Sequence, residues 1–232
     1  MSTIDEVADG IFRIHTPVSP TVTPGGFSYN QYLVLDDEPL LFHTGMRRSF
    51  DEVASAIARV VPLARLRHLA FSHWEQDECG ALDGFLARAP HAVPICSRIN
   101  VMINRDGISR TPRAMEDGEP LVLGKHRVRW FETPHLPHGW ESGLLLEETT
   151  GTFFCGDLFS QPGTCDKPLV ESDIFGPSEA LRAKLDYFAH GRDQRAQIER
   201  LAASSPQVLA CMHGHAWAGD GAALLRELAA TV

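Results

Sequence analysis

The first part of the chain alternates between hydrophobic and polar positions, which is typical of strands with one buried face. Residues 7–15 (VADGIFRIH) show this alternation and predict a first strand. Residues 28–37 (SYNQYLVLDD) and 38–45 (EPLLFHTG) predict the two strands of a hairpin, with the turn at DDEP, residues 36–39.

The next stretch changes to helical spacing. Residues 49–60 (SFDEVASAIARV) place apolar side chains three or four positions apart, and Ser49 with Glu52 has the pattern of a capping box. Three further segments follow in alternation: a strand at 67–72 (RHLAFS), a helix at 79–89 (CGALDGFLARA) and a strand at 92–96 (AVPIC). This order is the rhythm of βαβ units.

The second half repeats the same classes of element. Residues 104–124 are polar and rich in turn formers, and they predict a long loop with little regular structure. Three strand regions are predicted at 126–133, at 142–157 with a tight turn at TTG, and at 207–214. Helices are predicted over 178–203, with a break near Gly191, and over 219–232. Two similar halves of this kind predict an α/β fold, an αββα sandwich in which helices flank two mixed β-sheets, as a single domain over 1–232.

Composition narrows the class of protein. A chain of 232 residues with 44% hydrophobic positions can bury a full core, and its net charge of −9 disfavours a nucleic-acid surface and a polybasic membrane contact. No apolar run approaches the roughly 18 residues that a membrane helix needs. The five cysteines form no CxxC pair, and the first ten residues are acidic and polar, unlike a secretory leader. We therefore expect a cytoplasmic protein with reduced thiols.

Metal-ligand residue types gather where predicted strands end. His73, Glu75 and Asp77 directly follow the strand at 67–72, and an extended segment would point all three the same way. Three more candidates follow later strands: His138, Asp157 and His213. Open α/β sheets collect their ligands at the carboxyl ends of strands, so the six side chains are expected to meet.

The chemistry of this set favours two metal ions. Three imidazoles and three carboxylates exceed the needs of one metal with an open position, and one carboxylate could bridge a pair. Histidine and carboxylate without thiolate suits iron, manganese or zinc, and the share of carboxylates favours iron or manganese. Cys79 and Cys155 lie near the set in sequence, but their spacing predicts buried small side chains instead of ligands.

Four of these stretches carry a family resemblance. SHWEQD at 72–77, GDLF at 156–159, CMHGH at 211–215 and SYNQYL at 28–33 resemble the metallo-β-lactamase fold. Most hydrolases of that superfamily have His-x-His-x-Asp-His in the first of them. The His-x-Glu-x-Asp variant present here resembles the flavodiiron proteins and related stand-alone oxygen-binding diiron proteins.

A fifth segment supports the same subgroup. HGWES at 138–142 resembles the His-Trp-Pro-Asp-Ser segment of the flavodiiron proteins, and the whole resemblance covers about residues 5–218.

The resemblance implies a role for each ligand candidate. His73, Glu75 and His138 would hold one iron ion, Asp77 and His213 would hold the second, and Asp157 would bridge them.

The resemblance also implies partners. The family's diiron centre binds O₂, and flavodiiron members reduce O₂ or NO with electrons from a fused flavodoxin-like domain. The chain ends at Val232, so we expect no flavin in it. Reduction would then need an external electron donor, whereas an O₂ carrier, or an O₂ sensor with a signalling partner, would need none. A homodimer is compatible with each of these roles.

Several neighbouring residues have roles that the pattern leaves open. Glu78 stands where most relatives have histidine, and it could be an extra ligand or face solvent. His43 replaces the aspartate of an Asp-Thr-Gly motif and could hydrogen-bond a ligand carboxylate. His135 and His215 could be extra ligands, or could contact the ligand residues without reaching the metal. Three tryptophans could wall the pocket or pack in the core: Trp74, Trp140 and Trp217.

Two other functional classes compete with diiron chemistry. A dinuclear hydrolase with two zinc or manganese ions would activate water against an ester, thioester or amide. Its fold would be the same, but Glu75 stands where hydrolases have histidine. A signalling protein with a partly filled site is the third class, and the full set of ligand residues argues against it.

Overall fold

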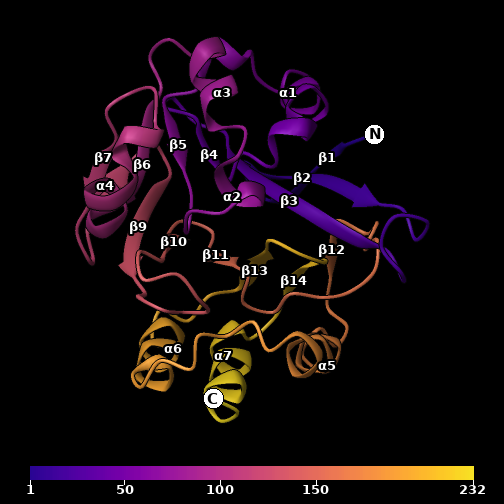
Figure 1. Cartoon of the computed structure of the whole chain (residues 1–232). Helices are drawn as coiled ribbons and strands as arrows, with labels where there is room; N and C mark the ends of the chain where they lie inside the picture. The colour runs from indigo at the N-terminus through magenta and orange to yellow at the C-terminus, as the bar shows by residue number, and fades with distance from the viewer.

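The computed structural model describes residues 1–232 as two seven-stranded sheets packed face to face, with helices on both outer surfaces. Figure 1 shows α1 and α3 on one outer side and α5, α6 and α7 on the other. The predicted αββα sandwich with two mixed sheets is therefore confirmed.

The first sheet comes from the first half of the chain. Its strand order is β1-β2-β3-β4-β5-β6-β7, antiparallel from β1 to β4 and parallel from β4 to β7. The strands are β1 (Thr3–Ala8), β2 (Ile11–Val18), β3 (Phe27–Val34), β4 (Leu40–Phe42), β5 (His68–Ala70), β6 (Val93–Ser97) and β7 (Arg113–Met115).

The second sheet comes from the second half. Its strand order is β12-β14-β13-β11-β10-β9-β8, and only the pairs β11–β13 and β12–β14 are parallel. The strands are β8 (Pro120–Val122), β9 (Arg127–Glu132), β10 (Gly143–Glu147), β11 (Thr152–Gly156), β12 (Leu169–Val170), β13 (Val208–Cys211) and β14 (Ala216–Ala218).

The helices are short and join or cover these strands. The α-helices are α1 (Phe50–Ile57), α2 (Gln76–Cys79), α3 (Leu82–Arg88), α4 (Arg98–Asn104), α5 (Phe175–Leu185), α6 (Gln194–Ala202) and α7 (Gly221–Ala229). Single 3₁₀ turns occur at Arg47–Ser49, Leu63–Arg65 and Arg105–Gly107. None of the helices combines the length and hydropathy needed to cross a bilayer.

Three apolar layers hold the sandwich together. One lies between the first sheet and the helices α1 and α3, and includes Val53, Leu69 and Phe85. A second lies between the second sheet and the C-terminal helices, and a third joins the two sheets through side chains such as Phe42 and Phe154, whose rings are 5.2 Å apart. The two halves thus share one core, which supports a single domain over 1–232; that assignment stays a prediction.

Three local predictions were wrong. Residues 7–15 form parts of two strands, because Gly10 adopts φ +68° and turns the chain between β1 and β2. Residues 104–124 are more ordered than a loop, since β7 and β8 pair there with the edges of the two sheets. The capping box is absent: Ser49 is the N-cap of α1, but its side chain makes no cap hydrogen bond.

The helical prediction for 178–203 is correct in type and incomplete in detail. Helix α5 ends at Leu185 and α6 begins at Gln194, so the break around Gly191 is a connection of eight residues. This connection carries Tyr187, which becomes important at the site.

Candidate metal centre

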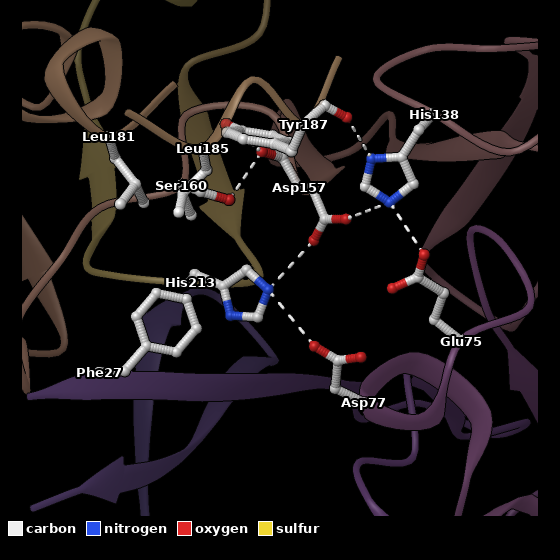
Figure 2. A pocket seen from close by; sticks show the side chains of 10 residues that line it. All are labelled: Phe27, Glu75, Asp77, His138, Asp157, Ser160, Leu181, Leu185, Tyr187 and His213. Carbon is white, nitrogen blue, oxygen red and sulfur yellow. Dashed lines mark hydrogen bonds and ion pairs between the residues drawn. The ribbon is translucent and has the colours of Figure 1, made fainter. Parts of the chain in front are cut away.

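The six predicted ligand residues meet at one edge of the sandwich. His73, Glu75 and Asp77 follow β5, and His138 lies in the loop after β9. Asp157 comes directly after β11, and His213 follows shortly after β13. Five of the six line one cavity, and Figure 2 shows their side chains turned toward its centre: Glu75, Asp77, His138, Asp157 and His213. His73 lies beside them and is almost completely buried.

The first loop is not the extended segment that the sequence pattern suggested. Glu75 is extended and serves as the N-cap of the short helix α2, whose first turn contains Asp77 and Glu78. The helical turn therefore brings a further carboxylate, that of Glu78, into the interior beside Asp77. In a fully extended segment the Glu78 side chain would have pointed to the opposite side.

Two backbone features place the later ligands. The β11–β13 pairing shifts register between Phe154 and Gly156, and such an irregularity re-aims the residue that follows, here Asp157. Gly139 has φ +78°, and a Cβ there would lie 3.2 Å from the Cβ of His73. Glycine thus lets the loop that bears His138 approach His73 closely.

The first group of ligand atoms surrounds the Oδ2 atom of Asp157. This atom lies 3.4 Å from Nε2 of His73 and 3.3 Å from Nε2 of His138. The two imidazole nitrogens are 3.0 Å apart, and Oε1 of Glu75 lies 3.3 Å from Nε2 of His138. Four side chains thus direct one donor atom each toward the same small volume.

The second group lies on the other side of the same carboxylate. Oδ1 of Asp157 is 3.2 Å from Nε2 of His213, which is itself 3.6 Å from Oδ2 of Asp77. Ligand atoms of Asp77, Glu78 and His213 all lie within 4.8 Å of one another. The two oxygens of Asp157 therefore face two separate donor groups, as a bridging carboxylate requires.

The Nδ1 atoms of two histidines are held by backbone carbonyls. His138 donates Nδ1–H to the carbonyl of Tyr187 at 2.8 Å, and His213 donates Nδ1–H to the carbonyl of Ser28 at 2.9 Å. In a neutral imidazole this leaves the lone pair on Nε2, which faces the cavity and is ready for a metal.

The third histidine is held by a relay of side chains. Nδ1 of His73 lies 2.9 Å from the Ser72 hydroxyl, which lies 2.9 Å from Nε2 of His43. Nδ1 of His43 lies 3.0 Å from the sulfur of Met212. The sequence left open a hydrogen bond from His43 to a ligand carboxylate; in the structure the contact of His43 with the centre runs through Ser72.

The charges at the centre are balanced only by imidazoles. The ion-pair partners of Glu75, Asp77, Glu78 and Asp157 are all histidines, with no lysine or arginine among them. Oδ1 of Asp157 and both carboxylate oxygens of Glu78 are buried without a hydrogen bond. Buried charges of this kind are stabilised when they are paired or bind a metal, so the donor set fits a cation site.

The close packing of buried acids and imidazoles shifts several pKa values at the centre. Burial raises the pKa of Glu78 well above its usual range, and the nearby charge of Asp157 raises it further. Burial lowers the pKa of His138, but the bond to Glu75 and the charge of Asp157 outweigh it and raise that pKa to about 9. Burial raises the pKa of Asp157, yet the contact with His213 and the charge of His73 hold it below its usual range. Acids and bases here neutralise one another, and a cation would compete with the protons.

The cavity beside the donor groups is small and has an apolar wall. Its volume is about 160 Å³, and the wall consists of Phe27, Leu181, Leu185 and Tyr187. Figure 2 shows Phe27, Leu181 and Leu185 on the His213 side and Tyr187 close to Asp157. A space of this size and character suits a very small uncharged ligand.

Several neighbouring residues whose roles the sequence left open lie outside the cavity lining. The three tryptophans are absent from the cavity lining; Trp74 packs against the first core layer, and Trp140 is 49% exposed. His135 contributes its carbonyl to Gln194 and belongs to none of the donor groups. His215 lies with Nδ1 3.2 Å from Gln161 Oε1, also outside these groups.

The residues that the sequence did not reveal come from segments without a motif. Tyr187 lies in the connection between α5 and α6, and Leu181 and Leu185 lie on α5. The two leucines lie four positions apart, a spacing common in helices, and Ser178 is the one buried residue of α5, so the sequence carries no distinctive signal for them.

Comparison with known proteins agrees with this geometry. Residues 27–214, more than half of the chain, match the family described as ODP family beta lactamase. The chain belongs to this family. The resemblance to the metallo-β-lactamase fold and to flavodiiron proteins is confirmed by its relatives.

Two curated proteins illustrate the sequence similarity of this ODP family chain. The anaerobic nitric oxide reductase flavorubredoxin of Pectobacterium atrosepticum is 27% identical over 212 residues, covering 86% of the chain and 41% of that protein. The rubredoxin-oxygen oxidoreductase of Megalodesulfovibrio gigas is 28% identical over 163 residues, covering 69% and 36%. The chain thus spans roughly two fifths of the length of such relatives.

A solved structure shows the shared fold. A mutant of the flavo di-iron protein from Thermotoga maritima superposes with a TM-score of 0.85 at 19% identity, covering 99% of this ODP family chain and 61% of that protein.

Proposed function

We propose that this protein holds two iron ions and binds O₂ or NO at them. The observation that carries the proposal is the carboxylate of Asp157, whose two oxygens face separate donor groups. His73, Glu75 and His138 would hold one ion and Asp77 and His213 the other, with Asp157 between them. Iron is favoured because half of these six donors are carboxylates, which form a harder and more anionic site than histidine alone.

Each part of the site has a role that follows from its contacts. The carbonyls of Tyr187 and Ser28 orient two imidazoles, and Ser72 orients the third. The wall formed by Phe27, Leu181 and the more exposed Leu185 offers apolar surface to a small ligand beside the donors. A bound iron pair would supply the electrons that O₂ or NO accepts.

The relatives support this assignment of ligand and partner. Their names describe nitric oxide reduction and a rubredoxin-oxygen oxidoreductase, and the solved relative is named a flavo di-iron protein. For this chain we infer a role in O₂ or NO binding, with reduction dependent on an external electron donor. The five free cysteines support a reducing compartment, and we propose the cytoplasm.

The decisive experiment measures metal and gas together. The protein is purified without oxygen from iron-replete cells, its iron, manganese and zinc are quantified, and the reduced form is exposed to O₂ or NO while its absorption is recorded. Two irons per chain and a gas-dependent absorption band are expected. Two zinc ions, no spectral change and turnover of an ester or thioester would instead establish the hydrolase.

A further inference from the structure

Glu78 is a buried acid without a hydrogen-bond partner. Its side chain is 0% exposed, and neither carboxylate oxygen makes a hydrogen bond. Burying an unpaired carboxylate is costly, because the lost hydration is not replaced.

A second buried glutamate in the same protein shows how the cost of burying a carboxylate is usually compensated. Glu147 is also 0% exposed, but it accepts hydrogen bonds from the backbone N–H groups of Thr149 and Thr150 and lies 3.2 Å from Nδ1 of His126. Glu78 accepts no hydrogen bond, and its one ion-pair contact, with Nε2 of His73, is long at 3.9 Å. Its burial therefore points to a partner of another kind.

The backbone of Glu78 fixes where its side chain can go. Its carbonyl accepts the N–H of Thr44 at 2.7 Å and the Thr44 hydroxyl at 3.3 Å. With the backbone tied to this loop, the carboxylate extends into the donor cluster, where Oε2 lies 3.9 Å from Nε2 of His73.

Glu78 reaches both donor groups. Its carboxylate lies within 4.8 Å of donor atoms of Asp77 and His213, and it also forms a group with His73 and Glu75. We propose that Glu78 is a seventh ligand of the centre, binding chiefly the ion held by Asp77 and His213. This inference rests on the proposed two-metal function.

Such a ligand changes the charge of the site. Glu75, Asp77, Glu78 and Asp157 carry four negative charges in their ionised forms, which equal the charge of two divalent ions. Without Glu78 the same pair would carry one uncompensated positive charge. A neutral cluster in a buried site stabilises the pair and favours hard ions such as Mn²⁺ or Fe²⁺.

The test uses Mn²⁺ as the probe, because electron paramagnetic resonance distinguishes one ion from a coupled pair. Wild-type protein and Glu78→Gln are stripped of metal, titrated with Mn²⁺ and measured for stoichiometry and spectrum. Glutamine keeps the size but removes the charge. We expect two ions and a coupled spectrum for the wild type, and a second-ion affinity at least about tenfold weaker for Glu78→Gln.

Glu141→Gln is the matched control. Glu141 is another buried acid of this region, and its Oε1 accepts the backbone N–H of Trp74, a bond that a glutamine oxygen can keep. It belongs to none of the donor groups, so this variant should bind two Mn²⁺ ions like the wild type.

Two further measurements exclude misfolding. Metal-free Glu78→Gln should melt no lower than the metal-free wild type, because it removes a buried unpaired acid. Glu78→His should recover tight binding of the second ion, with an altered spectrum from the added nitrogen.

The outcomes separate the two proposals. If Glu78→Gln binds two Mn²⁺ ions as tightly as the wild type, the seventh-ligand inference is overturned and the two-metal function stands. If the wild type binds fewer than two ions, the proposed function fails, and the inference fails with it.

Discussion

The Oδ1 atom of Asp157 lies 3.2 Å from Nε2 of His213, while Oδ2 of the same carboxylate faces the other two imidazoles of the cluster. The residue thus joins two donor groups from the centre of the site. Its position directly after β11 makes this possible, because a rigid buried strand holds the carboxylate in place.

Replacing Asp157 by asparagine should therefore disrupt both metal positions. The amide keeps the shape but loses the charge and one of two equivalent oxygens. We expect metal affinity to fall at least about 100-fold, since even the loss of an outer partner costs about 10–100-fold. Isothermal titration with Mn²⁺ measures the effect. Asp106→Asn, at a fully exposed position, is the control, and equal affinities for the two variants would contradict the bridging role.

Glu75 should select the metal. Glu75→His would convert the loop to the pattern of the hydrolases, and the added imidazole favours zinc over iron. We expect the iron-to-zinc ratio to fall in protein purified from cells grown with both metals, as measured by elemental analysis. An unchanged ratio would show that the carboxylate at this position does not determine metal preference.

The hydrogen-bonded chain from His73 through Ser72 to His43 should strengthen metal binding although Ser72 and His43 do not contact the metal. Ser72→Ala removes the hydroxyl that lies 2.9 Å from Nδ1 of His73 and the link to His43. A loss of about 10–100-fold in metal affinity is expected, because an outer hydrogen-bond partner fixes the orientation of the imidazole that binds the metal. Ser19→Ala, in an exposed loop, controls for the loss of a hydroxyl. Ser72→Thr should retain most of the affinity if its hydroxyl reaches the same two nitrogens.

Metal-free protein should lose stability as the pH rises from about 6.5 to about 9. The pKa of His138 is raised to about 9 by Glu75 and Asp157, against the lowering effect of burial. A raised folded-state pKa means that the folded protein binds more protons than the unfolded chain, so this stabilisation is complete below pH ~6.5 and lost through pH ~9.

The shifts of His213 and Glu78 act in the same direction, because both pKa values are raised in the fold. Chemical denaturation at several pH values, with chelator present, measures the slope. In His138→Asn the free energy of unfolding should fall less steeply with pH. An unaltered slope would show that other groups cause the pH dependence.

Filling the apolar side of the cavity should hinder the gas and spare the metals. Leu181→Trp adds bulk to a cavity of about 160 Å³, and its wall is separate from the donor atoms. The reaction of the reduced protein with O₂ or NO should slow several-fold in stopped-flow absorption, with metal content unchanged. Val122→Trp, at an exposed sheet edge, is the control. Equal rates would place the gas route elsewhere.

Sequence patterns predicted the secondary structure well where an element is long enough to show its buried face, and poorly where an element is short or interrupted. Alternation and helical spacing predicted most strands and helices, because these patterns reflect which face of an element is buried. They failed at the short edge strands β7 and β8, whose three residues each carry too little pattern, and at Gly10, where one glycine divides a run that otherwise alternates.

The sequence by itself predicted the fold class and the six residues proposed as metal donors, because strand ends and donor types are local features that a chain displays in order. Only the tertiary structure decided how the donors divide into two groups around Asp157, and that Glu78 turns inward while His135 does not. It also supplied the apolar wall and the carbonyls of Tyr187 and Ser28. These depend on packing between segments far apart in the chain, and side-chain direction after a turn is set by that packing, which no local pattern records.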